Sequence, residues 1–406
     1  MVCDKIDHIL ECVLKTTNAI SIDEITDYKL RAVIMANTAL GQMIAKDPRA
    51  NNNLIGALDA AEKISDIRQK STILRQIAVS LATSQRLDQN YETKIFDIIK
   101  TIQHPIDKIR ALMEVASVKQ SLGHNEEAQK ILSVVMENLK DIEGRPDEAW
   151  LIMEAGTYWR LLNNKDMAKK LFLRALHLER NLTDPLGRIL ILSEASRRLS
   201  LLGDQSQAEE SLNKATALLS LIESDGEKIL AENTIALAYA AYGKTSISID
   251  FLTKAFQEIK GISEPAFRAR LFSNIALVQW RMGDVVEATK TMAAVKRDLN
   301  LISNESDRVW AEQDIYDGWA TSAVELSMEN RFLEAADMTD MIEDPIKKSW
   351  TERRIAIFMT QAGDQKGGQQ ILFKSLMSAS HIANKWDHQK AFSEIIPTAL
   401  ELGITQ

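Results

Sequence analysis

Six glycines of this chain are separated from one another by multiples of forty residues. They are Gly123, Gly203, Gly243, Gly283, Gly363 and Gly403, and Asn163 occupies one of the omitted positions. Prolines recur at nearly the same interval, at Pro105, Pro146, Pro185, Pro265 and Pro345. A fixed period of this length is typical of stacked repeats, in which each unit packs only against its neighbours. The sequence therefore predicts a solenoid of repeats and not a set of separate globular domains.

The residues of each repeat have the spacing of two amphipathic helices joined by a turn. In one repeat we expect helices over 107–122 and 125–140, because apolar residues recur there at steps of three and four. These residues are Ile109, Leu112, Met113 and Ala116, then Ala128, Ile131, Leu132 and Val135. A glycine between them can adopt the left-handed conformation that ends a helix. Asp204, Asp284 and Asp364 each follow such a glycine, where a carboxylate caps the next helix.

Small residues occupy two fixed positions in the repeat. Seven residues before the turn lie Ala116, Gly156, Ser196, Ala236, Ala276 and Ala356, and five after it lie Ala128, Ala168, Ala208, Ser248, Ala288 and Gly368. This pattern resembles the tetratricopeptide repeat over about residues 66–403, with a unit of forty residues in place of about 34. The resemblance implies an all-α, right-handed superhelical solenoid of antiparallel helix hairpins, with the first helices lining a concave binding face.

The repeats predict three parts of the chain, with about eight or nine hairpins in all. Residues 1–65 form weak N-terminal capping repeats, with helices over 23–46 and 53–65 and a loop at Asn51, Asn52 and Asn53. Residues 66–385 form the array, and residues 386–406 form a C-terminal capping helix.

One repeat departs from the period. No turn signal is present at position 323, and the next turn residue is Asn330. We therefore expect a first helix near 305–329 that is about seven residues, or two turns, longer than the others. Such a helix would protrude as a partner site or a dimer contact, or it would be neutral drift.

Composition and motifs disfavour several classes of function. The net charge of −8 and pI near 5.5 argue against nucleic acid and anionic membranes as partners. No secretory signal or membrane span is expected, and Cys3 and Cys12 are too far apart on a helix for a disulfide, so we expect a cytoplasmic protein. Gly243-Lys244-Thr245-Ser246 resembles the end of a phosphate loop without its first glycine or its strand. We predict no catalytic residue, metal or cofactor.

The resemblance implies that the first helices contact a ligand. The implied contact positions lie thirteen, ten, six, three and two residues before each turn. The residues selected there are Arg110, Trp150, Arg160, Arg197, Asn233, Arg270, Trp280, Arg281, Trp350 and Arg353. All these positions together hold six arginines, three tryptophans and no acid. Arginine suits a carboxylate or phosphate, and tryptophan is enriched at binding hot spots.

The predicted function is a non-catalytic scaffold or adaptor that binds a protein or an acidic or C-terminal-carboxylate peptide in the concave face. In a second interpretation the arginines pair with Glu154, Glu194, Glu232 and Glu287, and the tryptophans fill gaps between repeats. Two further alternatives are a self-assembling homo-oligomer, through the long helix or the ends, and a helical-repeat enzyme or nucleic-acid binder.

Overall fold

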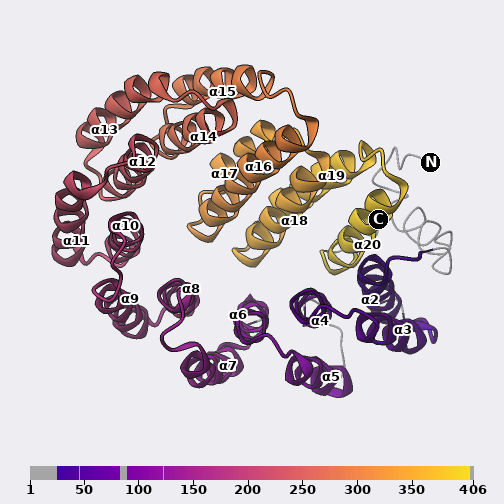
Figure 1. The fold of residues 1–406 in the computed structure, drawn as a ribbon. Coiled ribbons are helices and arrows are strands. Elements are labelled where there is room, and N and C mark those ends of the chain that lie inside the picture. The colour runs from indigo at the N-terminus through magenta and orange to yellow at the C-terminus, as the bar shows by residue number, and fades with distance from the viewer. Residues whose placement is uncertain (1–24, 45, 83–88, 122, 403–406) are drawn as a thin grey trace. The chain divides into compact units, whose positions relative to one another are not determined.

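The chain folds as paired helices. The computed structural model describes residues 25–44, 46–82, 89–121 and 123–402, and within them it contains α-helices and short 3-10 turns but no strand. The helices are α2 (Tyr28–Ile44), α3 (Ala50–Glu62), α4 (Ile67–Ala82), α5 (Gln89–Thr101), α6 (Pro105–Ser121), α7 (Asn125–Asn138), α8 (Glu148–Leu161), α9 (Lys165–Glu179), α10 (Pro185–Leu201), α11 (Gln205–Leu218), α12 (Asp225–Ala241), α13 (Thr245–Glu258), α14 (Pro265–Arg281), α15 (Val285–Leu299), α16 (Glu305–Met328), α17 (Phe332–Met338), α18 (Pro345–Gln361), α19 (Gln365–Ser380) and α20 (Lys385–Glu401). Consecutive helices pair as hairpins from α2–α3 to α18–α19, and α20 follows alone (Figure 1). The predicted all-α array of hairpins is confirmed. Gly403, Cys3 and Cys12 lie outside the described residues.

The turn residues adopt the conformation that the repeat period predicts. Positive φ angles occur at the turn glycines Gly123, Gly203, Gly243, Gly283 and Gly363, and also at Asn163 and Asn330. The side chains of Asp204, Asp284 and Asp364 accept hydrogen bonds from the backbone N–H three residues later. Each cap satisfies a donor that the first turn of a helix leaves unpaired. Both the turns and the caps are therefore confirmed.

The irregular repeat also has the predicted form. Helix α16 has 24 residues where α14 has 17, and α17 has seven where α13 has 14. The Arg281 guanidinium donates to the Ser322 hydroxyl at 3.2 Å, across a step of 41 residues. Ser200 bonds the Ala241 carbonyl across the same step, so α16 packs on α14 in the ordinary register. The additional residues therefore extend α16 at its C-terminal end.

The N-terminal hairpin differs from the prediction. Asn51, Asn52 and Asn53 do not form a loop, because they lie in the first turns of α3. The turn is at Lys46, whose φ is 58°. Asparagine disfavours helix only weakly, and burial of Ala50, Leu54 and Ala57 on one face of α3 outweighs that preference.

The small residues of each hairpin are buried where its two helices meet. The Ser196 hydroxyl donates to the Ala208 carbonyl, and the Ser248 hydroxyl donates to the Ala236 carbonyl, both at 2.8 Å. A Cβ atom at Gly156 would lie 2.4 Å from the Phe172 ring. Small residues at these positions therefore let the two helices approach closely, as predicted.

Two compact units make up the chain. Unit 1 comprises Met1–Ile142 and Ala323–Gln406, and unit 2 comprises Glu143–Ser322. In unit 1 the last helix, α20, packs against the first described helix, α2, as well as against α18 and α19. The Asn37 amide donates to the Ser393 hydroxyl at 3.4 Å, and Trp386 packs on Ile25 and Ile34. The first and last described helices of the chain therefore cap one another.

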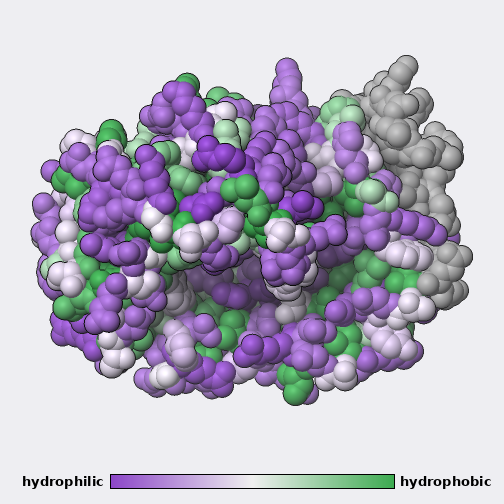
Figure 2. All heavy atoms as spheres, turned by 45° about the horizontal axis from the view of Figure 1, so that its top comes forward, coloured by the Kyte–Doolittle hydropathy of each residue, from purple (hydrophilic) through white to green (hydrophobic). Residues whose placement is uncertain are grey.

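In unit 2 the first helices form one layer and the second helices another. Helices α8, α10, α12 and α14 line the inner side of this unit, and α9, α11, α13 and α15 lie outside them (Figure 1). On the face of the molecule seen in Figure 2, hydrophilic residues predominate and hydrophobic residues gather only in small patches. This face therefore has no large apolar area of the kind that marks an interaction site.

Candidate binding face

The inner side of each first helix in unit 2 presents one stripe of residues that are exposed or half-buried, with Arg197 as the buried exception. Counted back from the turn, its positions are thirteen, nine, six and two, which are the steps of four, three and four that keep one face of an α-helix. The predicted set included positions ten and three, which turn toward the neighbouring first helix. That difference accounts for the burial of Asn233 and Trp280 but not for that of Arg197, which lies at position six.

The structure places the ten predicted residues in three environments. Trp150, Arg270 and Trp350 are exposed, Arg110, Arg160, Arg281 and Arg353 are half-buried, and Arg197, Asn233 and Trp280 are buried. Seven of the ten lie in unit 2, on α8, α10, α12 and α14, whereas Arg110, Trp350 and Arg353 lie in unit 1.

The buried residues have structural contacts that exclude them as ligand anchors in this conformation. The ring of Trp280 lies edge-on to that of Trp319, with centroids 5.8 Å apart. The Asn233 amide donates to the Leu271 carbonyl of the next first helix at 3.4 Å. These two side chains join neighbouring repeats, as the second interpretation of the sequence held for tryptophan.

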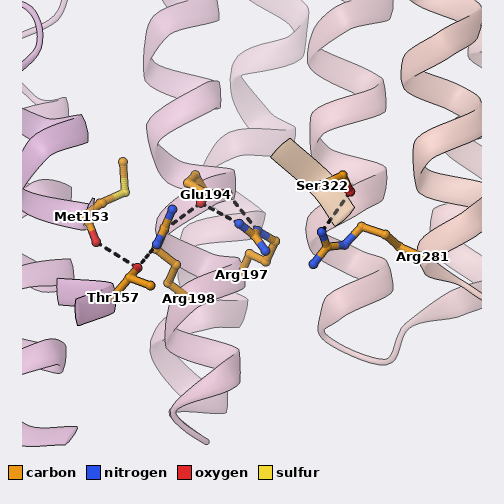
Figure 3. A network of polar contacts seen from close by, with 7 residues as sticks. All are labelled: Met153, Thr157, Glu194, Arg197, Arg198, Arg281 and Ser322. Atoms are coloured by element: carbon orange, nitrogen blue, oxygen red, sulfur yellow. Dashed lines mark hydrogen bonds and ion pairs between the residues drawn. The ribbon is translucent and has the colours of Figure 1, made fainter. Parts of the chain in front are cut away.

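Arg197 belongs to a polar network on α10 (Figure 3). Its Nη2 lies 2.8 Å from Oε1 of Glu194, and Nε of Arg198 lies 2.6 Å from the same oxygen. Arg198 also bonds the hydroxyl of Thr157 on α8. Burial raises the pKa of Glu194, but the charges and hydrogen bonds of the two arginines outweigh it and lower that pKa to about 2. Glu194 is therefore a stable anion that holds Arg197 away from a ligand.

Other predicted arginines also pair within their own unit. Nε of Arg270 lies 2.6 Å from Oδ2 of Asp314, and Nη2 of Arg353 lies 3.7 Å from Oε2 of Glu394. Burial lowers the pKa of Arg353 despite the nearby Glu394 carboxylate. Of the four acids expected as partners, Glu194 binds arginine.

Glu232 and Glu287 have a different kind of partner. Each bonds a lysine, Glu232 with Lys254 and Glu287 with Lys290. The second interpretation is therefore correct for Glu194, whereas Glu232 and Glu287 pair with lysine and not with arginine.

The expectation of an inner face without acids was wrong. The position nine residues before the turn was not among those carried over, although it lies on the same stripe. It holds Glu114 in unit 1, Glu154 and Glu194 on α8 and α10, and Thr234 and Asn274 on α12 and α14. Asp314 lies forty residues after Asn274 and has the equivalent place on α16, although the turn of that repeat is at Asn330. The inner face of unit 2 therefore contains carboxylates as well as arginines.

One exposed aromatic residue was missed by sequence reasoning. Trp310 lies forty residues after Arg270 and forty before Trp350, so it holds the same repeat position as both. It was overlooked because the turn of its repeat is displaced to Asn330. The exposed fractions are 71% for Trp310, 41% for Trp150 and 40% for Trp350. Because α16 packs on α14 in the ordinary register, the forty-residue spacing continues through this repeat, and that spacing could have identified Trp310.

Unit 2 also contains an enclosed space between α9 and α11. Its cavity volume is about 90 Å³, and Leu176, His177 and Lys214 contribute to its lining. Pockets for small molecules usually have roughly 300 Å³ or more. In the described ranges no group of three or more His, Cys, Asp or Glu could hold a metal ion, and no helix there is long and apolar enough to cross a membrane.

Known proteins resemble this chain in fold only. No family model and no curated protein matches the sequence. Solved structures that align with it include a Rap protein complexed with competence and sporulation factor, with 11% identity over 84% of this chain and 99% of that chain and a TM-score of 0.33. Aspartyl phosphate phosphatase F from Bacillus subtilis aligns with 11% identity, over 88% of this chain and 95% of that chain, with a TM-score of 0.33. A signal transduction ATPase with a tetratricopeptide repeat sensor from Pyrococcus horikoshii aligns with 9% identity, over 90% of this chain and 59% of that chain, with a TM-score of 0.28.

All three scores are below 0.5, so nothing about function follows from these alignments. The architecture is established by the hairpins themselves, with their left-handed turns, capped second helices and small residues at the helix contacts. The chain is an all-α array of tetratricopeptide-like helix hairpins.

Proposed function

We propose that this chain is a non-catalytic scaffold that binds an extended segment of a partner protein along the inner face of its first helices. The observation that carries the proposal is a row of residues at forty-residue steps on the first helices of unit 2, thirteen residues before the turn in its four regular repeats. It runs Trp150, Leu190, Leu230, Arg270 and Trp310, one residue on each successive first helix, and each is exposed or half-buried. Tryptophan and arginine are the residues most enriched at binding hot spots.

A row of this kind suits an extended peptide better than a small molecule. Each first helix presents one side chain, and the helices are held by buried contacts on both sides, so the row is preorganised. An extended peptide can place alternate side chains against successive helices while its backbone stays solvated.

The charge of the ligand is a separate question. An acidic or C-terminal-carboxylate peptide remains a prediction from the sequence. Binding such a peptide at Arg270 would require exchange of its ion pair with Asp314.

The test is selection of binders from a displayed library of random peptides, followed by affinity measurement with matched variants of one hairpin. Leu230→Glu places a charge on the inner row of α12, and Ile249→Glu places the same charge on the outer helix α13, where Ile249 is exposed. Selected peptides should lose affinity for the first variant and keep it for the second. Failure to select any peptide, or equal loss in both variants, would contradict the proposal. In the first case, mass measurements over a range of concentrations test self-assembly as the function.

A further inference from the structure

Both exposed tryptophans of unit 2 have a carboxylate residue on either side along the same helix face. Asp147 precedes Trp150 by three residues and Glu154 follows it by four. Asp307 and Asp314 have the same spacing around Trp310. Residues three and four apart are neighbours on a helix surface. Each tryptophan therefore lies between two acids, and we call these sets the α8 trio and the α16 trio.

Three of the four carboxylate side chains in the trios are exposed, and the fourth, Glu154, is half-buried. Asp147 is exposed, and its side chain makes no capping hydrogen bond at the start of α8. Asp307 and Asp314 are also exposed. Asp314 pairs with Arg270, but the two side chains are 55% and 52% exposed. An ion pair this exposed contributes little, so a cation of the ligand can share or replace Arg270 at small cost.

We propose that the α8 and α16 trios bind lysine or arginine side chains near the two ends of one extended, basic segment. This inference rests on the proposed function and specifies its ligand. A cation over a tryptophan face is attracted by the ring quadrupole, and flanking carboxylates can accept its hydrogen bonds. The chain's net charge of −8 favours the approach of a basic segment.

The distance between the trios sets the length of the ligand. Helix α16 is four first helices beyond α8, and packed helices are 8–10 Å apart, which gives roughly 30–40 Å between the trios. An extended chain rises about 3.3 Å per residue, so the two basic groups should be about ten residues apart. Between them the row presents Leu190 and Leu230, and then Arg270. The spacer should therefore be apolar in its first part and carry no cation opposite Arg270.

The third exposed tryptophan provides an internal control. Trp350 in unit 1 has the same repeat position, but Lys347 precedes it by three residues and Arg354 follows it by four. Its surroundings have the opposite charge, so it should not bind a basic side chain.

The test measures binding of fluorescent synthetic peptides to the full chain. The probe peptide has Lys-Arg-Lys at both ends of an uncharged, Val- and Thr-containing spacer of about ten residues. Comparison peptides replace every Lys and Arg with Glu, or shorten the spacer to about three residues. We expect the probe to bind most tightly, and Trp150→Ala and Trp310→Ala each to weaken it roughly five- to tenfold, while Trp350→Ala leaves affinity unchanged.

A second comparison separates cation–π attraction from apolar contact. Trp310→Phe should retain part of the affinity that Trp310→Leu loses, because only the aromatic side chain has a ring quadrupole. Circular dichroism establishes that each variant is folded.

Tighter binding of the Glu peptide, equal effects of the Trp150, Trp310 and Trp350 changes, or equal binding of the short-spacer peptide would overturn this inference. None of these results removes the proposed function, which fails only if no peptide binds the inner face.

Discussion

A buried glutamate in α18 should make unit 1 less stable as the pH rises. Glu352 is 1% exposed. Its carboxylate accepts hydrogen bonds from the hydroxyls of Ser378 at 2.7 Å and Thr339 at 3.5 Å. Burial raises its pKa from 4.5 to about 7, against the opposing effects of the Ser378 hydrogen bond and of Lys348 and Lys374. The folded protein therefore holds a proton on this group more tightly than the unfolded chain does.

The sign and size of the effect follow from these two pKa values. The contribution of protonated Glu352 to stability is complete below pH 4.5 and is lost as the pH rises through about 7. Linkage gives a loss of about 2–3 kcal/mol in the free energy of unfolding between about pH 5 and pH 8. Glu352→Gln keeps an acceptor for Ser378 and removes the ionisation. The variant should therefore be more stable than the wild type at the higher pH, by about 2–3 kcal/mol.

Hydrogen exchange of peptides from α17, α18 and α19 is the suitable assay, because repeat arrays unfold in parts and a single global unfolding free energy is not well defined. Urea denaturation at the same pH values gives an independent comparison. Glu312→Gln, on the partly exposed surface of α16, is the matched control and should show no such pH-dependent gain. Equal protection of wild type and Glu352→Gln across the pH range would refute the reasoning.

Four further predictions concern packing and turns. Glu194→Gln should destabilise unit 2 by about 3–5 kcal/mol, measured by urea denaturation, because it leaves a buried guanidinium without its counter-ion. Gly156→Ala should lower the thermal midpoint through a clash with Phe172, and Phe172→Leu should partly restore it; additive losses would contradict this. Asn330→Val should cost about 1–2 kcal/mol, while Asn330→Gly should be neutral or stabilising, because φ is 62° there. Trp386→Ala should increase hydrogen exchange in α2 as well as α20, and exchange confined to α20 would disprove their mutual capping.

Most of the fold could be predicted from the period of the turn residues. Asn330 could be identified as a displaced turn because the remaining repeats fix where the chain must return to register. Lys46 could not, since lysine has no preference for the left-handed conformation that it adopts there. The asparagine run of α3 was misread for a related reason: local propensity is a weak term that the packing of a helix face outweighs.

The site was less predictable than the fold. A helix face has a period of 3.6 residues, and the transferred set of positions omitted one member of the exposed stripe and included two that face a neighbouring helix. The ligand interpretation therefore left out the acids of that stripe. It assigned Arg197 to the ligand although Glu194, which only the second interpretation named as a partner, lies one turn away on the same helix. Side-chain pairing of this kind depends on rotamers and neighbouring repeats, which spacing alone does not determine.

The contact between α2 and α20 also affects how the chain can fold during synthesis. Asn37 and Ser393, which bond across this contact, are 356 residues apart in the sequence. At about 5–20 residues per second, a ribosome needs roughly 20–70 s to make the second partner after the first. During that time α20 is not available to cover its face of α2. The earliest hairpin to emerge is thus among the last to be completed, and a nascent chain stopped before α20 presents that face to chaperones and proteases.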